Sequence, residues 1–386
     1  MQKTKLRKYT SQIASCLNGA PKKMNEPFFS NEEYLYLKKC INNKSVSTYG
    51  KEVLKFEYLS SKFLKTKSSI AISSGTSALH MAMYALDINH KHEVLVPSIT
   101  FVATVNSIIY CGATPHFIDV SLDDLNIDCE KLEKYLEKIS VIKNNNCINK
   151  KTKKIIKAIV PVHTYGNSVN FSKLNKIIKK FNLKVVEDAA EGFGTKYRNK
   201  YVGTFGDIGV YSFNGNKIIT TGAGGLIVTK NLKLEKKIRH IISQSKIVSN
   251  GDIYSNELGF NLKMNALSAS LGIAQLKKID KILHEKEKLH NFYINKFKSF
   301  ENLKIIQPLN NKESNHWINI LSIQNIKKDE KNFILKKFEK LKFEVKPIWY
   351  PLHKMKYLKK YPKMNLRNSE IAYTTCVALP SSIGSK

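Results

Sequence analysis

Short apolar runs alternate with helix-like segments between residues 93 and 229 of this 386-residue chain. Parallel strands need helical crossovers between them, so this alternation predicts a mostly parallel sheet covered by helices. We therefore expect an α/β fold whose large domain occupies residues 25–275. The predicted strands are Glu93–Pro97, Thr114–Asp119, Ile155–Val162, Leu183–Glu187, Ile208–Phe213 and Gly225–Thr229.

The pattern changes on either side of this region. A long charged helix is predicted over Lys277–Phe300, and the short strands and helices that follow indicate a smaller α+β domain over residues 276–386. Residues 1–24 are polar and are predicted to form a poorly ordered arm. The lysine- and asparagine-rich run Lys143–Lys154 interrupts the alternation and is predicted to be a surface loop.

One lysine, Lys217, lies between an apolar strand-like run and a glycine-rich turn ending at Gly225. Burial among apolar neighbours lowers the pKa of a lysine toward the free amine, the form that bonds covalently to an aldehyde. Ser212, at the end of the preceding predicted strand, is placed to bond an anionic group of the same ligand. Taken alone, a lysine followed by glycines is more often a solvated hairpin residue, so other segments must decide.

A second segment, Gly75-Thr76-Ser77, follows a short apolar run and precedes apolar residues at helical spacing. The first amides of a helix are unpaired and its dipole favours an anion, so this segment suits a phosphate group. Thr76 and Ser77 would add their hydroxyls. Taken alone, the segment is better explained as an ordinary N-cap.

A third segment places carboxylates at the end of the predicted strand Leu183–Glu187. Ligands bind at the carboxyl ends of the strands in a parallel sheet. A carboxylate there keeps a pyridine nitrogen protonated, so that the ring withdraws electrons. Asp188 is the candidate for this role, although acidic strand ends also serve as helix caps.

Together these segments resemble the DegT/DnrJ/EryC1/StrS family of pyridoxal phosphate (PLP)-dependent sugar aminotransferases. The resemblance implies a type I aminotransferase-like fold, PLP as cofactor, and transfer of an amino group from a donor such as glutamate to a nucleotide sugar. It extends over nearly the whole chain, through Asn25-Glu26-Pro27, Gly75–His80, Val96–Thr104, Pro161–Gly166, Glu187–Glu191, Ser212-Phe213 with Lys217, Gly259-Phe260-Asn261 and Pro351-Leu352-His353.

The resemblance also implies roles for single residues around the cofactor ring. Lys217 matches the lysine that holds PLP covalently and moves the proton, and Asp188 matches the partner of the pyridinium nitrogen. Phe101 matches the aromatic residue that stacks on the ring. Glu191 matches the residue beside the ring hydroxyl, where relatives often have glutamine or histidine, because a carboxylate there would repel a phenolate unless a proton is shared.

Other matches concern the phosphate group and the substrate. Gly75, Thr76, Ser77 and Ser212 match the phosphate site, while Asn261 matches an asparagine that reaches the phosphate from the neighbouring subunit. The resemblance therefore implies a homodimer with shared active sites. A lone histidine is usually structural, and only the resemblance places His353 in the substrate pocket.

The substrate expectation is narrower than the family. Phe213–Lys217 and Trp349–Lys354 look most like the branch that acts on UDP-linked 4-keto-6-deoxy-N-acetylhexosamines, in bacillosamine and legionaminic acid pathways. An aminotransferase acting at C4 of a dTDP- or GDP-4-keto-6-deoxyhexose, as in perosamine synthesis, is the main alternative. Relatives that dehydrate sugars have histidine in place of Lys217, which favours transamination. An inactive PLP-fold regulator should lose this lysine or the carboxylate, and both are present.

The formal net charge of +33 would ordinarily suggest a nucleic-acid partner. The excess is almost wholly scattered lysine, however, whereas nucleic-acid sites favour arginine and stacked aromatics. We therefore expect no nucleic-acid function, although a positive field would attract an anionic nucleotide sugar.

The chain is expected to work in the cytoplasm without a membrane anchor or a metal. Its six cysteines are scattered, with no pair at metal-ligand spacing, and are expected to be reduced. The basic N-terminus leads into no apolar stretch of signal-peptide length, and no later segment approaches a membrane span.

Overall fold

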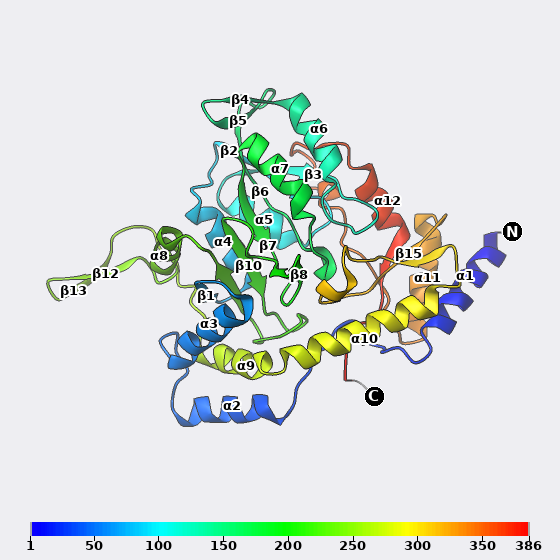
Figure 1. Cartoon of the computed structure of the whole chain (residues 1–386), viewed down its shortest axis with the longest axis horizontal. Helices are drawn as coiled ribbons and strands as arrows, with labels where there is room; N and C mark the ends of the chain where they lie inside the picture. Colours follow the sequence, from blue (N-terminus) through cyan, green and yellow to red (C-terminus); the bar gives the residue numbers. More distant parts are fainter. Residues whose placement is uncertain (1, 385–386) are drawn as a thin grey trace.

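A nine-stranded sheet forms the centre of the computed structural model, which describes residues 2–384 (Figure 1). The path through the sheet runs β1-β11-β10-β7-β6-β2-β3. Its strands are β1 (Ser69–Ile72), β11 (Gly225–Val228), β10 (Ile208–Ser212), β7 (Lys184–Asp188), β6 (Ile155–Ile159), β2 (His92–Pro97) and β3 (Thr114–Ile118).

The pairs from β10 through β7, β6 and β2 to β3 are parallel, whereas β11 is antiparallel to both β10 and β1. The predicted mostly parallel sheet is therefore confirmed, and each predicted strand is present within a few residues of its expected bounds. Every residue of β1, β10 and β11 is buried, as expected for strands that are covered on both faces. Carboxyl ends of the parallel strands meet at one edge, where ligands bind in such sheets.

Helices follow most strands of the sheet. The spacing of apolar residues in each sequence determines which face of the helix packs against the sheet. In α7 the residues at helical spacing that are buried are Phe171, Leu174, Ile177 and Phe181. The Asn170 side chain accepts a hydrogen bond from the amide of Lys173 and caps this helix. These helices are α4 (Gly75–Ala85), α5 (Val102–Tyr110), α6 (Cys129–Ile139), α7 (Phe171–Phe181) and α8 (Leu232–Ile241).

The surface loop predicted over residues 143–154 is wrong in its first half. Strands β4 (Ser140–Lys143) and β5 (Asn146–Asn149) form an antiparallel hairpin there. Its two turn residues, Asn144 and Asn145, have φ of 48° and 61°. Asparagine tolerates this left-handed conformation, which two-residue hairpin turns require.

A smaller antiparallel sheet in the order β14-β15-β17-β16 forms the core of the C-terminal part. The long helix predicted over Lys277–Phe300 is present as α10 (Ile279–Phe297). A separate helix, α9 (Ala266–Leu276), ends just before it. The other elements are β14 (Leu303–Ile305), β15 (Ile320–Ile323), β16 (Lys346–Pro347), β17 (Cys376–Ala378), α11 (Lys328–Lys340) and α12 (Arg367–Thr375).

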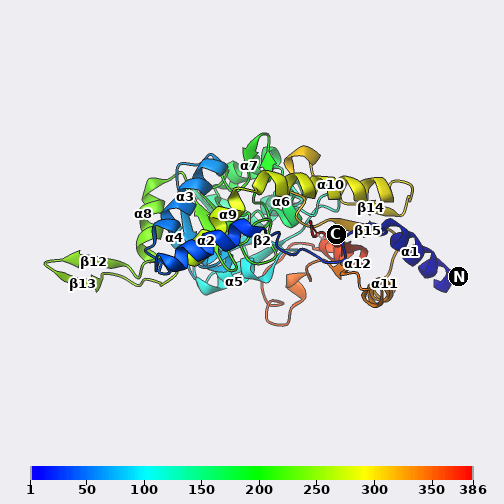
Figure 2. The same cartoon turned by 90° about the horizontal axis from the view of Figure 1, so that it is seen from below.

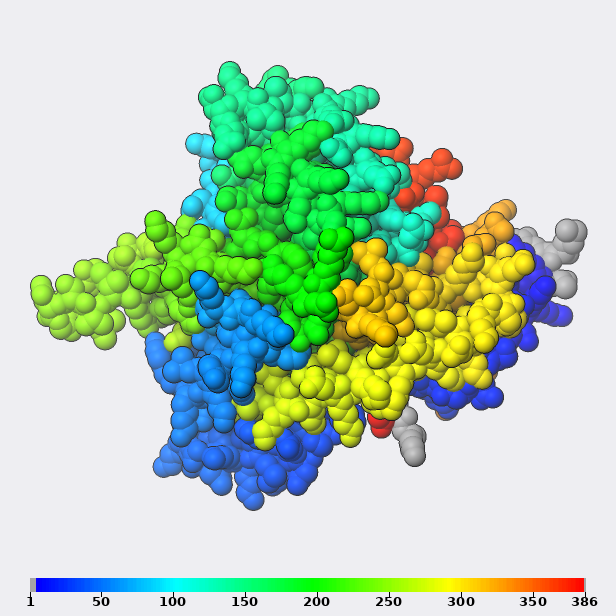
Figure 3. Space-filling view, viewed as in Figure 1, coloured from blue at the N-terminus to red at the C-terminus, as the bar shows by residue number. Residues whose placement is uncertain are grey.

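The predicted N-terminal arm is also different in the structure, where Gln2–Cys16 form helix α1. Tyr9, Ile13 and Cys16 are spaced for one helix face and are buried in a cluster with Tyr293 of α10 and Phe338 of α11. Figures 1 and 3 show α1 lying beside α10 and α11 at one end of the molecule. Polar and basic residues, including three lysines, separate the apolar residues of α1, so their helical spacing was not recognised in the sequence.

A thin hairpin stands out at the opposite end from α1, as both cartoon views and the space-filling view show (Figures 1, 2 and 3). It consists of β12 (Lys246–Ser249) and β13 (Asp252–Ser255). Helices α2 (Asn31–Asn42) and α3 (Lys51–Leu64) pack against α9, and a short ladder joins β8 (Lys196–Tyr197) to β9 (Lys200–Tyr201). Within residues 2–384, no helix combines the length and apolar character needed to cross a membrane.

Candidate active site

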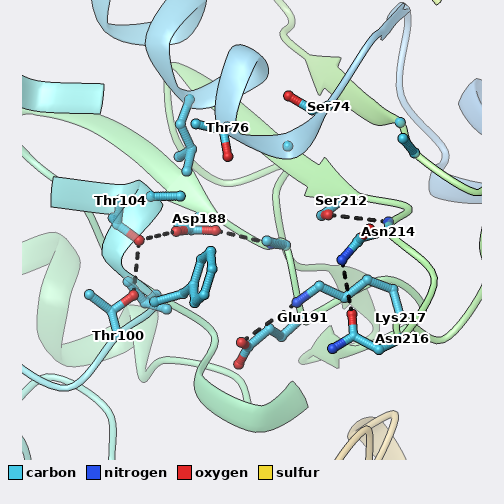
Figure 4. A pocket seen from close by; sticks show the side chains of 18 of the residues that line it. Ser74, Thr76, Thr100, Thr104, Asp188, Glu191, Ser212, Asn214, Asn216 and Lys217 are labelled. Atoms are coloured by element: carbon cyan, nitrogen blue, oxygen red, sulfur yellow. Dashed lines mark hydrogen bonds and ion pairs between the residues drawn. The ribbon is translucent and has the colours of Figure 1, made fainter. Parts of the chain in front are cut away.

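A cavity of about 290 Å³ lies at the carboxyl edge of the main sheet (Figure 4). It is bounded by the start of α4, the ends of β7 and β10, and the loop after β10. The structure brings most of the predicted cofactor residues to this one cavity. Those that line it are Gly75, Thr76, Phe101, Asp188, Glu191, Ser212 and Lys217.

Lys217 projects from a loop that is closed at both ends. The amide of Phe213 donates to the carbonyl of Gly224 at 2.9 Å, and the amide of Thr221 donates to the carbonyl of Phe213 at 2.9 Å. Only 14% of the Lys217 side chain is exposed, and burial lowers its pKa. Its Nζ lies 4.0 Å from the centre of the Trp317 ring. The sequence prediction of a lysine that favours the free amine therefore has a structural basis.

Glu191 faces this amine, with Oε1 3.7 Å from Lys217 Nζ (Figure 4). Its other oxygen accepts a hydrogen bond from the amide of Tyr165 at 2.7 Å. Burial raises the pKa of Glu191 to about 7, even though the amine and the amide both favour the carboxylate. Glu191 and Lys217 thus form a buried acid–base pair in which burial moves the two pKa values toward each other.

Asp188 is held rigidly at the end of β7. Thr104 Oγ1 donates to its Oδ2 at 2.7 Å, and the amide of Ala190 donates to its Oδ1 at 3.1 Å. Thr100 continues this chain through a 2.9 Å bond between its hydroxyl and that of Thr104. Burial raises the pKa of Asp188, whereas the hydrogen bonds from Thr104 and Ala190 and the nearby Lys217 favour its carboxylate.

The start of α4 lies directly beside the end of β10. A Cβ on Gly75 would come within 2.7 Å of the Ser212 Cβ, so only glycine permits this approach. Ser74 caps the helix by accepting from the amide of Ser77 at 3.0 Å. The amides of Gly75 and Thr76 precede the first helical hydrogen bond and have no partner within the helix. Thr76 and Ser212 line the cavity at this point.

Three predicted residues lie outside the cavity lining. The Ser77 hydroxyl is bonded to that of Ser74 at 2.9 Å. Asn261 is exposed, and its backbone forms an isolated antiparallel β-bridge with Ser243. His353 is buried between Ser98, at 2.7 Å from its Nδ1, and Glu370, at 3.2 Å from its Nε2, as a structural histidine would be.

Several lining residues were missed by the sequence reasoning. Thr100 lies just before α5 and Thr104 lies in its first turn, both within the stretch Val96–Thr104 that carried the family resemblance. The others come from loops or from the small domain, where no periodicity points to the cavity. The missed lining residues include Ser74, Thr100, Thr104, Asn214, Asn216 and Trp349.

The donor set fits PLP. An aldehyde needs an amine of lowered pKa, which Lys217 provides, and a pyridine nitrogen needs a buried carboxylate, which Asp188 provides. A phosphate suits the free amides at the start of α4 with the hydroxyls of Thr76 and Ser212. All of these groups border one cavity.

Comparison with known proteins agrees with this chemistry. A model of the DegT/DnrJ/EryC1/StrS aminotransferase family matches residues 28–384. GDP-perosamine synthase of Escherichia coli O157:H7 is 33% identical over 339 residues, covering 88% of this chain and 87% of that protein. A UDP-4-amino-4,6-dideoxy-N-acetyl-beta-L-altrosamine transaminase of Helicobacter pylori is 31% identical over 366 residues, covering 92% and 91%.

A solved structure shows the same relationship. Helicobacter pylori PseC, an aminotransferase involved in the biosynthesis of pseudoaminic acid, superposes with a TM-score of 0.83 at 27% sequence identity. The match covers 93% of this chain and 94% of that protein. The fold and the arrangement of the whole chain are therefore those of this class of enzyme.

Proposed function

The chain belongs to the DegT/DnrJ/EryC1/StrS aminotransferase family and is a PLP-dependent sugar-nucleotide aminotransferase; within this class, we propose that it aminates the C4 ketone of a 4-keto-6-deoxy sugar. The amino donor is glutamate, which leaves as 2-oxoglutarate. The observation that carries the proposal is the placement of Lys217 and Asp188 on one cavity beside a helix N-terminus.

When bound, PLP supplies an aldehyde for an amine and a ring that accepts electrons from the carbon that loses a proton. Lys217 would hold the cofactor, and its amine would move the proton at that carbon. Burial lowers the pKa of Lys217, which favours the free amine that acts as a base. Asp188, fixed by Thr104 and the amide of Ala190, holds the ring nitrogen in its protonated form.

Gly75, Thr76 and Ser212 hold the phosphate group in this proposal, and Phe101 covers the ring. Phe101 is 52% exposed and its ring centre lies 5.4 Å from that of Trp349, so the two aromatics together cover one side of the cavity. Glu191 takes or gives a proton beside Lys217, since its pKa near 7 suits that exchange.

The favoured substrate is a UDP-linked 4-keto-6-deoxy-N-acetylhexosamine. The segments around Lys217 and Trp349 support it, as does the similarity to the Helicobacter transaminase. A GDP-linked 4-keto-6-deoxyhexose is the second candidate, because GDP-perosamine synthases are equally similar to this chain.

The two candidates are separated by a direct assay. PLP-loaded enzyme and glutamate are incubated with each nucleotide sugar, and 2-oxoglutarate and the amino sugar are measured. Equal amounts of both products with the UDP-linked sugar, and little with the GDP- or dTDP-linked sugar, is the expected result. Preferred turnover of the GDP-linked sugar would reverse the substrate assignment.

The proposal includes a homodimer with shared active sites. Asn261 follows the projecting β12–β13 hairpin and does not line the cavity of its own chain. Exposed apolar side chains gather on the hairpin and on helices α2 and α3, which suits a surface that a second copy covers. Those with at least half of their surface exposed include Tyr34, Leu35, Ile41, Leu54, Tyr58, Val248, Ile253 and Tyr254.

A cytoplasmic location completes the proposal. It is supported by the six cysteines of this chain, all of which are free thiols in the structure. His353 stays a proposed substrate contact. For this contact the hydrogen bond between His353 and the half-exposed side chain of Glu370 would have to break.

A further inference from the structure

A buried lysine lies in the apolar stripe of α10. The inward residues of this helix are Ile279, Ile282, Lys286, His290 and Tyr293. Lys286 is 1% exposed, and no carboxylate of the described residues lies within ion-pair distance of it. Burying a charge without an ionic partner is unfavourable, so an apolar residue would suit the packing of this stripe better.

The amine of Lys286 donates instead to three oxygen atoms from three distant segments. These are the side-chain oxygen of Asn25, the carbonyl of Trp317 at 3.0 Å and the carbonyl of Ser381 at 2.5 Å. Three donors and three acceptors match the ammonium form. Burial lowers the pKa of Lys286 to about 7, whereas the three oxygen acceptors favour the ammonium form.

Two of these partners converge on one atom of the active-site loop. Asn25 Nδ2 donates to the carbonyl of Asn216 at 2.7 Å, and the indole Nε1 of Trp317 donates to the same carbonyl at 2.7 Å. Asn216 immediately precedes Lys217 in the chain. Trp317 also places its ring 4.0 Å from Lys217 Nζ.

We propose that Lys286 is a positioning residue for Lys217, which it fixes through Asn25 and Trp317 and the Asn216 carbonyl that both of them bind. The third partner, Ser381, ties this cluster to the N-terminal segment, because its amide donates to the carbonyl of Met24 at 2.7 Å. One buried amine thus joins the small domain, the segment around Asn25 and the loop that carries the reactive lysine. Lys286 does not line the cavity.

The test compares Lys286→Met with Lys331→Met. Lys331 is a matched control, because it is also 1% exposed with a pKa lowered by burial, to about 8, but it donates to the Tyr373 carbonyl on α12. Neither Lys331 nor Tyr373 lines the cavity. Each variant is prepared as the full chain, and its thermal midpoint is recorded.

The first readout uses protein without cofactor. The rate at which Lys217 reacts with an amine-directed reagent is measured by peptide mapping, and in Lys286→Met we expect it to change at least about threefold, because the loop is no longer fixed. The second readout uses PLP-loaded enzyme. There kcat should fall about tenfold with little change in KM for the sugar, since a small misplacement of a reacting group slows chemistry more than binding. Lys331→Met should leave both values unchanged.

A second pair of variants keeps the test decisive if Lys286→Met does not fold. Asn25→Ala and Trp317→Phe each remove one bond to the Asn216 carbonyl while Lys286 is intact, and each should give a smaller effect of the same kind. In a folded double variant, adding Asn25→Ala to Lys286→Met should add little, because both act through one path.

Two results would overturn the positioning role: unchanged Lys217 reactivity and kcat in Lys286→Met, or equal changes in Lys331→Met. The inference rests on the proposed function of Lys217. Peptide mapping of the PLP-loaded wild-type protein after borohydride reduction tests that function separately. A label on another lysine would contradict the assignment of Lys217. The positioning role of Lys286 would then be judged by the reactivity of Lys217 in the cofactor-free variants.

Discussion

Lys217 and Lys286 are both withdrawn from solvent, and burial lowers the pKa of each, yet their surroundings differ in kind. Lys217 faces a cavity and two carboxylates, one of them 3.7 Å away. Lys286 faces three fixed oxygen atoms and no cavity. Burial makes a lysine readily deprotonated, but only open space beside it makes the amine useful in chemistry. The first surrounding suits a reactive group, and the second suits a structural link.

The largest expected effect is the loss of activity when Lys217 is replaced. Lys217→Ala should abolish transamination, with a loss of at least about 10³-fold, because both the covalent bond to the cofactor and the proton transfer are removed. Lys286→Met should keep measurable turnover. Product formation from glutamate and the nucleotide sugar measures both, and substantial activity in Lys217→Ala would show that another amine serves.

A mixing experiment sharpens the role of Asn261, which lies outside the cavity of its own chain. Lys217→Ala and an inactivating Asn261 variant should each be inactive alone, yet regain activity after they are mixed and refolded together. In a shared-site dimer both defects of a hybrid fall in one site and leave the other intact. Random pairing gives about half hybrids, and therefore roughly a quarter of wild-type activity.

Mass spectrometry of differently tagged protomers provides the control for exchange. If hybrids form and the mixture stays inactive, Asn261 acts within its own chain.

Asp188→Asn should retain PLP but lower kcat by about 10²–10³-fold, since a neutral amide does not stabilise a protonated ring nitrogen. Thr104→Val removes the 2.7 Å bond to Asp188 and should have a smaller effect in the same direction. Steady-state kinetics with saturating PLP measure both. Near-normal kcat in Asp188→Asn would remove Asp188 from the mechanism.

Phe101→Ala should weaken PLP binding by about 3- to 10-fold, the loss expected for one stacked aromatic contact. The side chain is half exposed without ligand, so its removal leaves no core cavity and the thermal midpoint should change little. A titration of cofactor-free protein gives the dissociation constant. An unchanged constant would mean that Phe101 does not cover the ring.

A pH-dependent effect on stability is expected from Glu191, whose pKa is raised by burial to about 7. A carboxyl group with a raised pKa stabilises the fold at low pH, and this contribution is lost as the pH rises from about 4.5 through 7. The free energy of unfolding of the cofactor-free wild type should therefore fall over this range relative to Glu191→Gln, by up to about 3 kcal/mol. Urea unfolding at pH 5 and pH 8 measures the difference. A parallel pH dependence in both proteins would show that Glu191 is ionised throughout.

The sequence predicted the main sheet well because its strands are buried on both faces and appear as continuous apolar runs. It failed where apolar residues were diluted by lysine and asparagine. Helix α1 buries Tyr9, Ile13 and Cys16 among many charged neighbours, and the β4–β5 hairpin turns at Asn144 and Asn145. In both places a local pattern was present, a helical spacing in α1 and a turn dipeptide in the hairpin, but few of the surrounding residues were apolar.

The cavity was predictable where one segment carries the signal, as at Lys217 and Asp188. Trp349 was part of the segment Trp349–Lys354 that resembles the UDP-sugar branch, but its approach to Phe101 was not predicted. That approach, like the approach of Trp317 to Lys217, depends on how the C-terminal elements pack against the main sheet. In the sequence Lys286 is one lysine in a charged helix, and only its helical spacing from Ile282 and Tyr293 marks it as inward. Its importance comes from three acceptors that are far apart in the chain.

The most direct measurement reduces the PLP-loaded protein with borohydride and maps the labelled peptide. The label is expected on Lys217, whereas Lys286 and Lys331, which are also buried lysines of lowered pKa, are expected to stay unlabelled. A label on either of those lysines, or on any lysine other than Lys217, would contradict the central claim that the cavity selects the reactive amine.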